Sequence, residues 1–108
     1  MKKSEQIAIN ARVLGAMESF NRSYRVSEPV CKRLRSCSAV VMEFPEYYAL
    51  QSYNTIIAII DRRTDTLYDF LRYVYGYTAT SAQHISKFED DYSAGKWSCA
   101  ARYTYREV

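Results

Sequence analysis

The side chains best suited to acid–base or nucleophilic chemistry in this sequence are one histidine, His84, and three cysteines, Cys31, Cys37 and Cys99. A cysteine beside a histidine can form a nucleophile–base pair, but nothing in the spacing brings Cys37 to His84. A single imidazole excludes a metal site with two histidine ligands, and Cys31 and Cys37 do not have the spacing of zinc ligands. The sequence therefore predicts no catalytic residue, no metal and no cofactor, and favours a binding protein over an enzyme.

A second group of polar and aromatic side chains surrounds the start of a helix predicted over residues 81–92. Thr80 and Gln83 have the spacing of a capping box, in which a hydroxyl accepts from a free backbone N–H of the first turn. In a structural interpretation, Thr80 caps the helix and His84 bonds to a strand carbonyl or to the Tyr53 hydroxyl. In a functional interpretation, the exposed first turn contacts a partner or an anion. The candidate partner-binding residues are Tyr53, Tyr77, Thr80, Ser81, His84 and Lys87.

Positive charge is concentrated in the N-terminal third of the chain. Residues 1–36 contain eight Lys or Arg and three Asp or Glu, a net charge of +5, whereas residues 37–61 contain three acidic residues and no basic one. Basic side chains can contact phosphates while neighbouring tyrosines stack on bases. The candidates for contact with RNA, DNA or an acidic protein surface are Lys32, Arg33, Arg35, Arg62 and Arg63. No nucleic-acid recognition motif is present, so a solvent-exposed helix face explains Lys32, Arg33 and Arg35 equally well.

Hydrophobic periodicity divides the chain into the elements that must position these side chains. Helical spacing predicts helices over residues 5–21, with Ser4 as N-cap, and over residues 27–36. Apolar runs and alternation predict strands over residues 39–44, 47–53, 55–60, 66–75 and 97–106, with the helix over 81–92 before the last strand. The order favours an α+β fold with an antiparallel sheet of about four strands, two N-terminal helices, and the helices packed on one side of the sheet.

Length and composition are typical of one globular domain. The chain has 108 residues, of which 48% are hydrophobic, 25% are charged and eleven are tyrosine. Within a single domain over residues 1–108, we expect a basic helical unit at 1–36 and a sheet with a capped helix at 37–108. The longest nonpolar run, residues 56–60, is far shorter than the ~20 residues that cross a bilayer. No signal peptide is visible, so we expect a cytoplasmic protein without membrane contact.

Three segments resemble a family of short proteins carried by bacteriophages and other mobile elements. That family has a Ser-Tyr-x-Thr strand opening, similar to Ser52–Thr55, and a later Tyr-Ser-x-Thr-Thr-x-Lys-His-Ile-x-x-Phe segment entering a helix, similar to Tyr77–Phe88. The resemblance covers residues 51–92, and this chain departs from the motif at Thr78, Ser81 and Gln83.

The resemblance implies a phage-type protein that inhibits a bacterial host factor by direct binding. An anti-CRISPR inhibitor of a Cas effector nuclease is the specific expectation, in the cytoplasm of the bacterial host. The alternative is a nucleic-acid-binding accessory protein of a mobile element. The sequence leaves the oligomeric state open.

Overall fold

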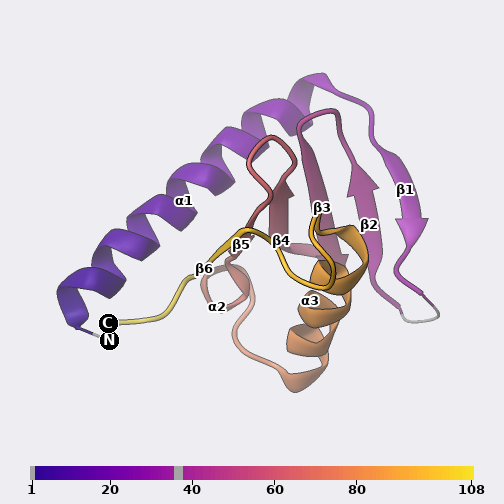
Figure 1. Ribbon diagram of the computed structural model, residues 1–108. Helices are drawn as coiled ribbons and strands as arrows, with labels where there is room; N and C mark the ends of the chain where they lie inside the picture. Colours follow the sequence, from indigo (N-terminus) through magenta and orange to yellow (C-terminus); the bar gives the residue numbers. More distant parts are fainter. Residues whose placement is uncertain (1, 36–37) are drawn as a thin grey trace.

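The computed structural model describes residues 2–35 and 38–108, and its α+β fold combines one long N-terminal helix with a six-stranded mixed sheet (Figure 1). The elements in chain order are α1 (Lys3–Val26), β1 (Val30–Arg33), β2 (Val40–Glu43), β3 (Tyr47–Ser52), β4 (Thr55–Asp61), β5 (Thr66–Asp69), α2 (Leu71–Val74), α3 (Ala79–Tyr92) and β6 (Ala101–Thr104). No helix in the described part of the chain has the length and hydrophobicity needed to cross a membrane.

The strands lie in the sheet in the same order as in the sequence. Each of the pairs from β1–β2 to β4–β5 is antiparallel, as successive strands joined by short turns must be. β6 instead runs parallel to β5, because α2 and α3 carry the chain back to the other end of the sheet first. The prediction of an antiparallel sheet of four strands is therefore wrong in strand number and in the direction of β6.

Helix α1 covers one face of the sheet. Its apolar side chains, including the fully buried Val13 and Phe20, pack against Phe44, Ala49 and Ile59. The helix is longer than the predicted 5–21, and Lys2 stands at its N-cap without a side-chain hydrogen bond, so the predicted Ser4 cap is wrong. Packing against the sheet over most of its length keeps α1 helical without that cap.

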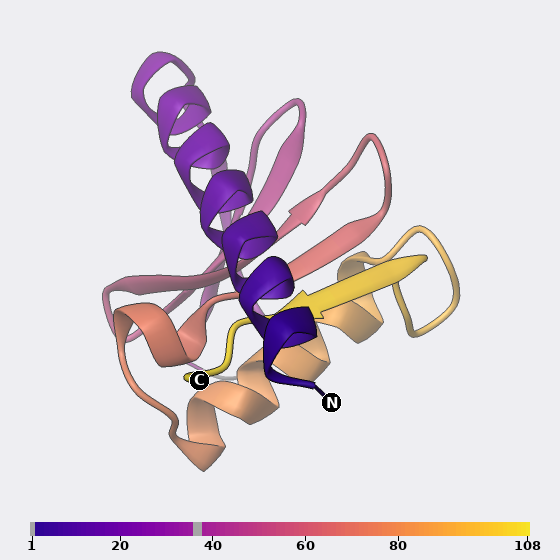
Figure 2. The same cartoon turned by 90° about the vertical axis from the view of Figure 1, so that its left-hand side faces the viewer.

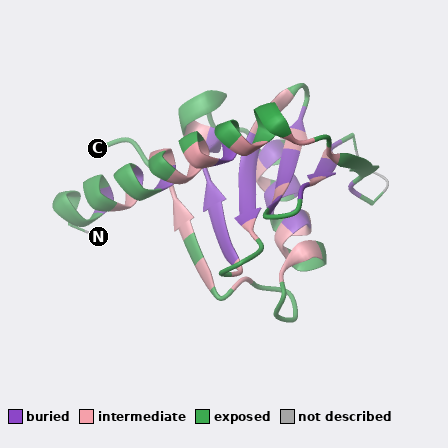
Figure 3. Cartoon of the chain, turned by 90° about the horizontal axis from the view of Figure 1, so that it is seen from above, coloured by how far each residue is buried: buried purple, intermediate pink, exposed green. Residues whose placement is uncertain are grey.

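Helix α3 covers the opposite face of the sheet. Ile85 and Phe88 are buried against Leu50 and Ala58, which belong to a second apolar cluster. In β4, Ile59 faces α1 whereas its neighbour Ala58 faces α3, as the alternation of side chains along a strand requires. The prediction that the helices share one side is thus corrected. Figure 2 shows α1 in front of the strands, and Figure 3 shows that the central strands are mostly buried.

The second predicted helix, over residues 27–36, is wrong. Val30–Arg33 form the edge strand β1, which pairs with Val40–Glu43 and leaves all four residues exposed. Because β1 belongs to the sheet, the predicted boundary at residue 36 does not separate a helical unit from a sheet unit. Ser36 and Cys37 lie outside the described residues.

The predicted strand over 66–75 ends at Asp69 and is followed by the single helical turn α2. The predicted strand over 97–106 shortens to β6, because residues 94–100 form a loop held by Asp65. Burial acts to raise the pKa of Asp65, but hydrogen bonds from the backbone N–H groups of Ala94 and Ala100 outweigh it and lower that pKa. The Asp65 carboxylate thereby fixes the approach to β6.

Two amide side chains of α1 join the helix to the C-terminal tail. The Gln6 amide donates to the Thr104 carbonyl over 3.0 Å. The Asn10 side chain accepts from the Arg106 backbone N–H at 3.0 Å and donates to the Arg106 carbonyl at 2.6 Å. These bonds fix the position of Arg106 relative to α1 and the sheet.

Candidate functional site

Four exposed tyrosines belong to α2, the segment that follows it and the turn between β3 and β4; Tyr73 of α2 packs against Tyr105. The tyrosine patch consists of Tyr53 (49% exposed), Tyr73 (50%), Tyr75 (48%) and Tyr77 (57%). Tyr53 and Asn54 form the two-residue turn with positive φ angles of 57° and 105°, which is typical of a tight hairpin and uncommon for a residue as large as tyrosine. The turn brings the Tyr53 ring onto the Tyr75 ring, with centroids 6.4 Å apart in a stacked arrangement.

Two of the six candidate partner-binding residues lie in the interior. The Nδ1 atom of His84 is 2.9 Å from the Ser52 hydroxyl, which is 3.2 Å from the Ser81 hydroxyl. His84 is 4% exposed and Ser81 is fully buried. The expected partners of His84, a strand carbonyl or the Tyr53 hydroxyl, are replaced in the structure by the Ser52 hydroxyl.

Burial, and secondarily the charge of Lys87, lower the pKa of His84. The imidazole is therefore uncharged near neutral pH. Its Nδ1 atom can donate a hydrogen bond to the Ser52 hydroxyl or accept one from it, depending on the tautomer. The cluster of Ser52, Ser81 and His84 ties the start of α3 to the end of β3, directly beneath Tyr53.

The start of α3 is capped by Thr78, two residues before the predicted cap. The Thr78 hydroxyl accepts a hydrogen bond from the Ser81 backbone N–H at 3.1 Å. Thr80 lies inside the first turn and is exposed, whereas Lys87 is partly buried further along α3. Of the candidates for partner contact, Tyr53, Tyr77 and Thr80 are therefore the exposed ones.

Most of the predicted nucleic-acid contacts already have intramolecular partners. Lys32 lies 2.9 Å from Glu43, and Arg35 forms a two-pronged pair with Asp91 at 2.8 and 2.9 Å, which lowers the Asp91 pKa. Arg63 pairs with carboxylates of the β3–β4 region, and Arg62 donates to a backbone carbonyl at 2.7 Å. Arg33 is exposed, and no ion pair of its side chain is found among the described residues. Arg62 lies over the Tyr48 ring at 4.4 Å, whereas Arg63 lies over the neighbouring Tyr47 ring at 5.4 Å.

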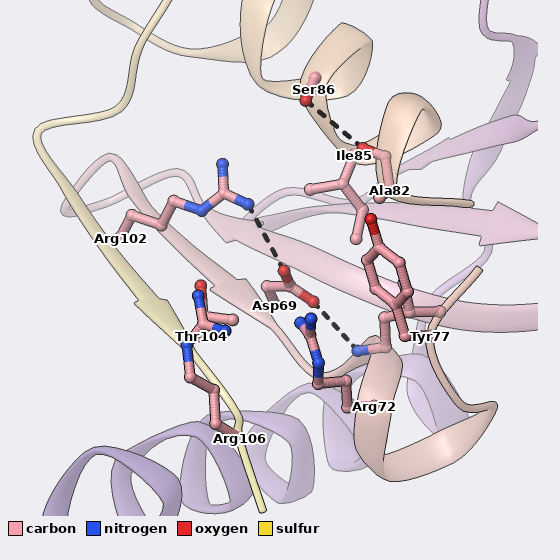
Figure 4. Close-up of a pocket in the computed structure, with 10 residues that line it drawn as sticks. Asp69, Arg72, Tyr77, Ala82, Ile85, Ser86, Arg102, Thr104 and Arg106 are labelled. Carbon is pink, nitrogen blue, oxygen red and sulfur yellow. Dashed lines mark hydrogen bonds and ion pairs between the residues drawn. The ribbon is translucent and has the colours of Figure 1, made fainter. Parts of the chain in front are cut away.

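A pocket of about 350 Å³ lies between β6, α2 and α3 (Figure 4). Arg72 extends into it from α2, and Arg102 and Arg106 extend into it from β6 and the tail that follows. The apolar floor consists of Leu71 and Ile85, each 1% exposed. We call this feature the arginine pocket. It shares Tyr77 with the tyrosine patch.

The arginine pocket has more positive than negative charge. Asp69, 6% exposed, is the carboxylate on its wall, and it accepts from the Leu71 backbone N–H at 3.1 Å and from Arg102 at 3.4 Å. Arg102 also donates to Glu89 at 2.9 Å. Among the described residues, Arg72 and Arg106 have no carboxylate within ion-pair distance. The pocket therefore has two uncompensated guanidinium groups.

No family model, no curated protein and no solved structure matches this chain.

Within the described residues, no three His, Cys, Asp or Glu side chains are grouped in a way that could hold a metal ion. Burial raises the pKa of Cys99 to about 12, so its thiol is protonated at neutral pH and is a poor nucleophile. Cys99 packs against the apolar cluster under α3. Cys37, considered above as a nucleophile for His84, lies outside the described residues.

Sequence reasoning missed the arginine pocket although part of its signal was present. Arg102, Thr104 and Arg106 alternate with Tyr103 and Tyr105, and the structure places the tyrosines beside the α1 cluster and Arg102, Thr104 and Arg106 on the pocket wall. Arg72 had no such signal, because it lay in a segment predicted as a strand. The parallel return of β6 brings the three arginines together.

Proposed function

We propose that this chain binds and inhibits a bacterial host protein by covering part of its surface, and that the tyrosine patch makes the central contact. The observation that carries this proposal is the exposure of the stacked pair Tyr53 and Tyr75, with two further half-exposed tyrosines of the patch close to Tyr75 in the sequence. Tyrosine is enriched where proteins bind one another, because it buries a large rigid ring and still offers a hydroxyl.

The local geometry supports a preformed contact surface. Tyr53 is fixed at the tip of a tight turn and stacks on Tyr75, while Arg72 lies over the Tyr77 ring at 4.5 Å. Side chains already held in place lose little conformational entropy when a partner binds. The strained turn at Tyr53 is of the kind that proteins keep at functional sites.

The class of partner comes from the resemblance to phage and mobile-element proteins. A bacterial Cas effector nuclease is the first target to test, since steric blockade of a nuclease requires a compact surface and no catalytic machinery. The nucleic-acid alternative has less support, because Lys32, Arg35 and Arg63 are paired with carboxylates.

The test measures DNA cleavage by purified Cas effectors in the presence of the purified chain. We expect cleavage to fall with increasing wild-type protein. A variant carrying Tyr53→Asn and Tyr75→Ala should require at least about tenfold more protein for the same inhibition. Asparagine is chosen at position 53 because it tolerates the positive φ angle of that turn.

Trp97→Ala is the matched control, because it removes another exposed aromatic ring, 67% accessible, on the loop before β6. It should inhibit as well as the wild type. Equal loss in both variants would contradict the role of the patch. Failure to inhibit any effector, together with no specific protein recovered from host lysate at micromolar bait, would contradict host-protein binding.

A further inference from the structure

We propose that the arginine pocket binds the phosphate group of a small phosphate-bearing ligand, with Arg72, Arg102 and Arg106 supplying the donors. This site is separate from the tyrosine contacts of the proposed function, although Tyr77 borders both. Figure 4 shows Asp69 between the guanidinium group of Arg102 on one side and those of Arg72 and Arg106 on the other.

Charge balance is the first argument for an anion. Three arginines line the pocket, and the carboxylates that neutralise charge there, Asp69 and Glu89, both pair with Arg102. Like charges brought together without a counter-ion repel one another, so Arg72 and Arg106 are held close at a cost that a bound anion removes. Glu107 borders an adjoining hollow but forms no ion pair with either arginine.

The chemistry of the lining is the second argument. Arginine presents a planar fork of N–H groups that matches the oxygens of phosphate two at a time. Thr104 and Tyr77 add hydroxyl groups to the wall. Because donors outnumber acceptors there, a ligand rich in acceptor oxygens satisfies the pocket better than a cation does.

The arginines are also positioned before any ligand arrives. Arg102 is held by Glu89 at 2.9 Å, and Arg72 by its stacking over Tyr77. The backbone of Arg106 is fixed on both sides by Asn10 of α1. Preorganised donors lose little freedom on binding, which increases affinity.

Size and shape favour a small molecule over a polymer. The pocket volume of about 350 Å³ lies at the low end of the range for small-ligand sites, which is about 300–1,000 Å³. The apolar floor of Leu71 and Ile85 can accept the non-phosphate part of an organic ligand. A nucleic-acid strand needs a basic groove that continues along its backbone, whereas the adjoining hollow shares Arg72 and Arg106 with the pocket and adds no further basic residue.

The test is calorimetric titration of the full chain at constant ionic strength with adenosine monophosphate, inorganic phosphate and adenosine. We expect saturable one-to-one binding of the monophosphate and of phosphate, and no binding of adenosine. Tighter binding of the monophosphate than of phosphate identifies an organic phosphate as the ligand, and equal binding identifies free phosphate. Adenosine binding as tightly as the monophosphate would overturn the proposal.

A charge-matched pair of variants separates the pocket from general attraction. Arg72→Gln with Arg106→Gln should weaken binding at least about tenfold for each arginine removed, because hydrogen bonds from charged donors are lost. Arg22→Gln with Arg25→Gln removes the same two charges from α1 and should bind as the wild type does. Equal weakening in both double variants would refute a specific site.

Two further measurements keep the outcome interpretable. If the glutamine variant unfolds, Arg72→Lys with Arg106→Lys keeps the charge without the fork, and its phosphate affinity should lie below that of the wild type. A single-stranded oligonucleotide that binds more tightly than the monophosphate, and depends on the same arginines, would overturn the small-ligand assignment. The single variant Arg106→Gln leaves Arg72 over the Tyr77 ring and should retain host-protein inhibition, and the tyrosine variant should retain phosphate binding, so the two proposals can fail independently.

Discussion

At the scale of single residues, His84 is a reactive side chain that the fold buries and joins to a hydroxyl group. The sequence identifies it as the one imidazole, and its neighbours in a motif direct attention to it. The fold places it in the interior, where the Ser52 hydroxyl occupies one ring nitrogen. Its use in the protein is to hold α3 against β3, beneath the exposed Tyr53.

The pH dependence of stability tests this role. Because burial lowers the pKa of folded His84 below its ordinary value of about 6.5, the unfolded chain binds the proton more readily. The His84 contribution to stability is complete above pH ~6.5 and is lost as pH falls from there to the folded pKa, by at most about 1.4 kcal/mol per pH unit.

The variant His84→Asn retains a polar partner for Ser52 and cannot titrate in this range. Its unfolding free energy, measured in urea between pH 5 and pH 8, should lack the His84 component of the pH slope. If the unfolding free energies of the wild type and of His84→Asn depend on pH in the same way, His84 has the same charge in the folded and the unfolded state.

At the scale of elements, two nearby threonines at the start of α3 differ in role: Thr78 caps the helix and Thr80 does not. Thr78→Ala should lower the unfolding free energy by about 1 kcal/mol, because the Ser81 N–H loses its acceptor. Thr80→Ala, on the exposed first turn, should change it by less than about 0.5 kcal/mol. Urea unfolding of the two variants checks the assignment. A larger loss of unfolding free energy for Thr80→Ala than for Thr78→Ala would favour the predicted capping box of Thr80 and Gln83.

The sequence predicts some elements well because local pattern and tertiary contact agree there. The apolar run of β4 fits a buried strand, and the spacing of Ile85 and Phe88 fits one face of the helix α3. The charged segment at 30–33 reads as a helix surface, but pairing with β2 outweighs this weak local preference. A hydrophobic stripe shows that one side of a helix is buried, but it does not show which face of the sheet the helix covers. The sequence therefore could not predict that α1 and α3 lie on opposite faces of the sheet.

The candidate site was predictable only where its residues adjoin in sequence. Tyr77 and Tyr53 were identified because they belong to local motifs. The arginine pocket brings Arg72 next to Arg102 and Arg106 through the parallel return of β6, which no local spacing encodes.

At the scale of the whole molecule, the exposed strand β1 gives Lys32 and Arg33 a role independent of any partner. β1 is the last strand on its side of the sheet, so its outer backbone groups are open to pairing with another chain. Charged side chains on edge strands, lysine above all, discourage such pairing.

Replacing this charge should therefore promote self-association. With Lys32→Val and Arg33→Val, we expect the average mass in sedimentation velocity to rise with concentration more steeply than for the wild type. Arg22→Val with Arg25→Val removes the same charge from α1 and should behave as the wild type. Indistinguishable sedimentation of all three proteins would remove this role from β1.

The bonds between α1 and the C-terminal tail set an order of events during synthesis. Gln6 and Asn10 bond to residues 98 and 96 positions later, whereas Phe20 contacts Phe44 and Tyr47, which follow soon after it. The C-terminal half of α1 can settle on β3 while much of the chain is still on the ribosome. Its N-terminal half, and with it the backbone of Arg106, can become fixed only after β6 has emerged.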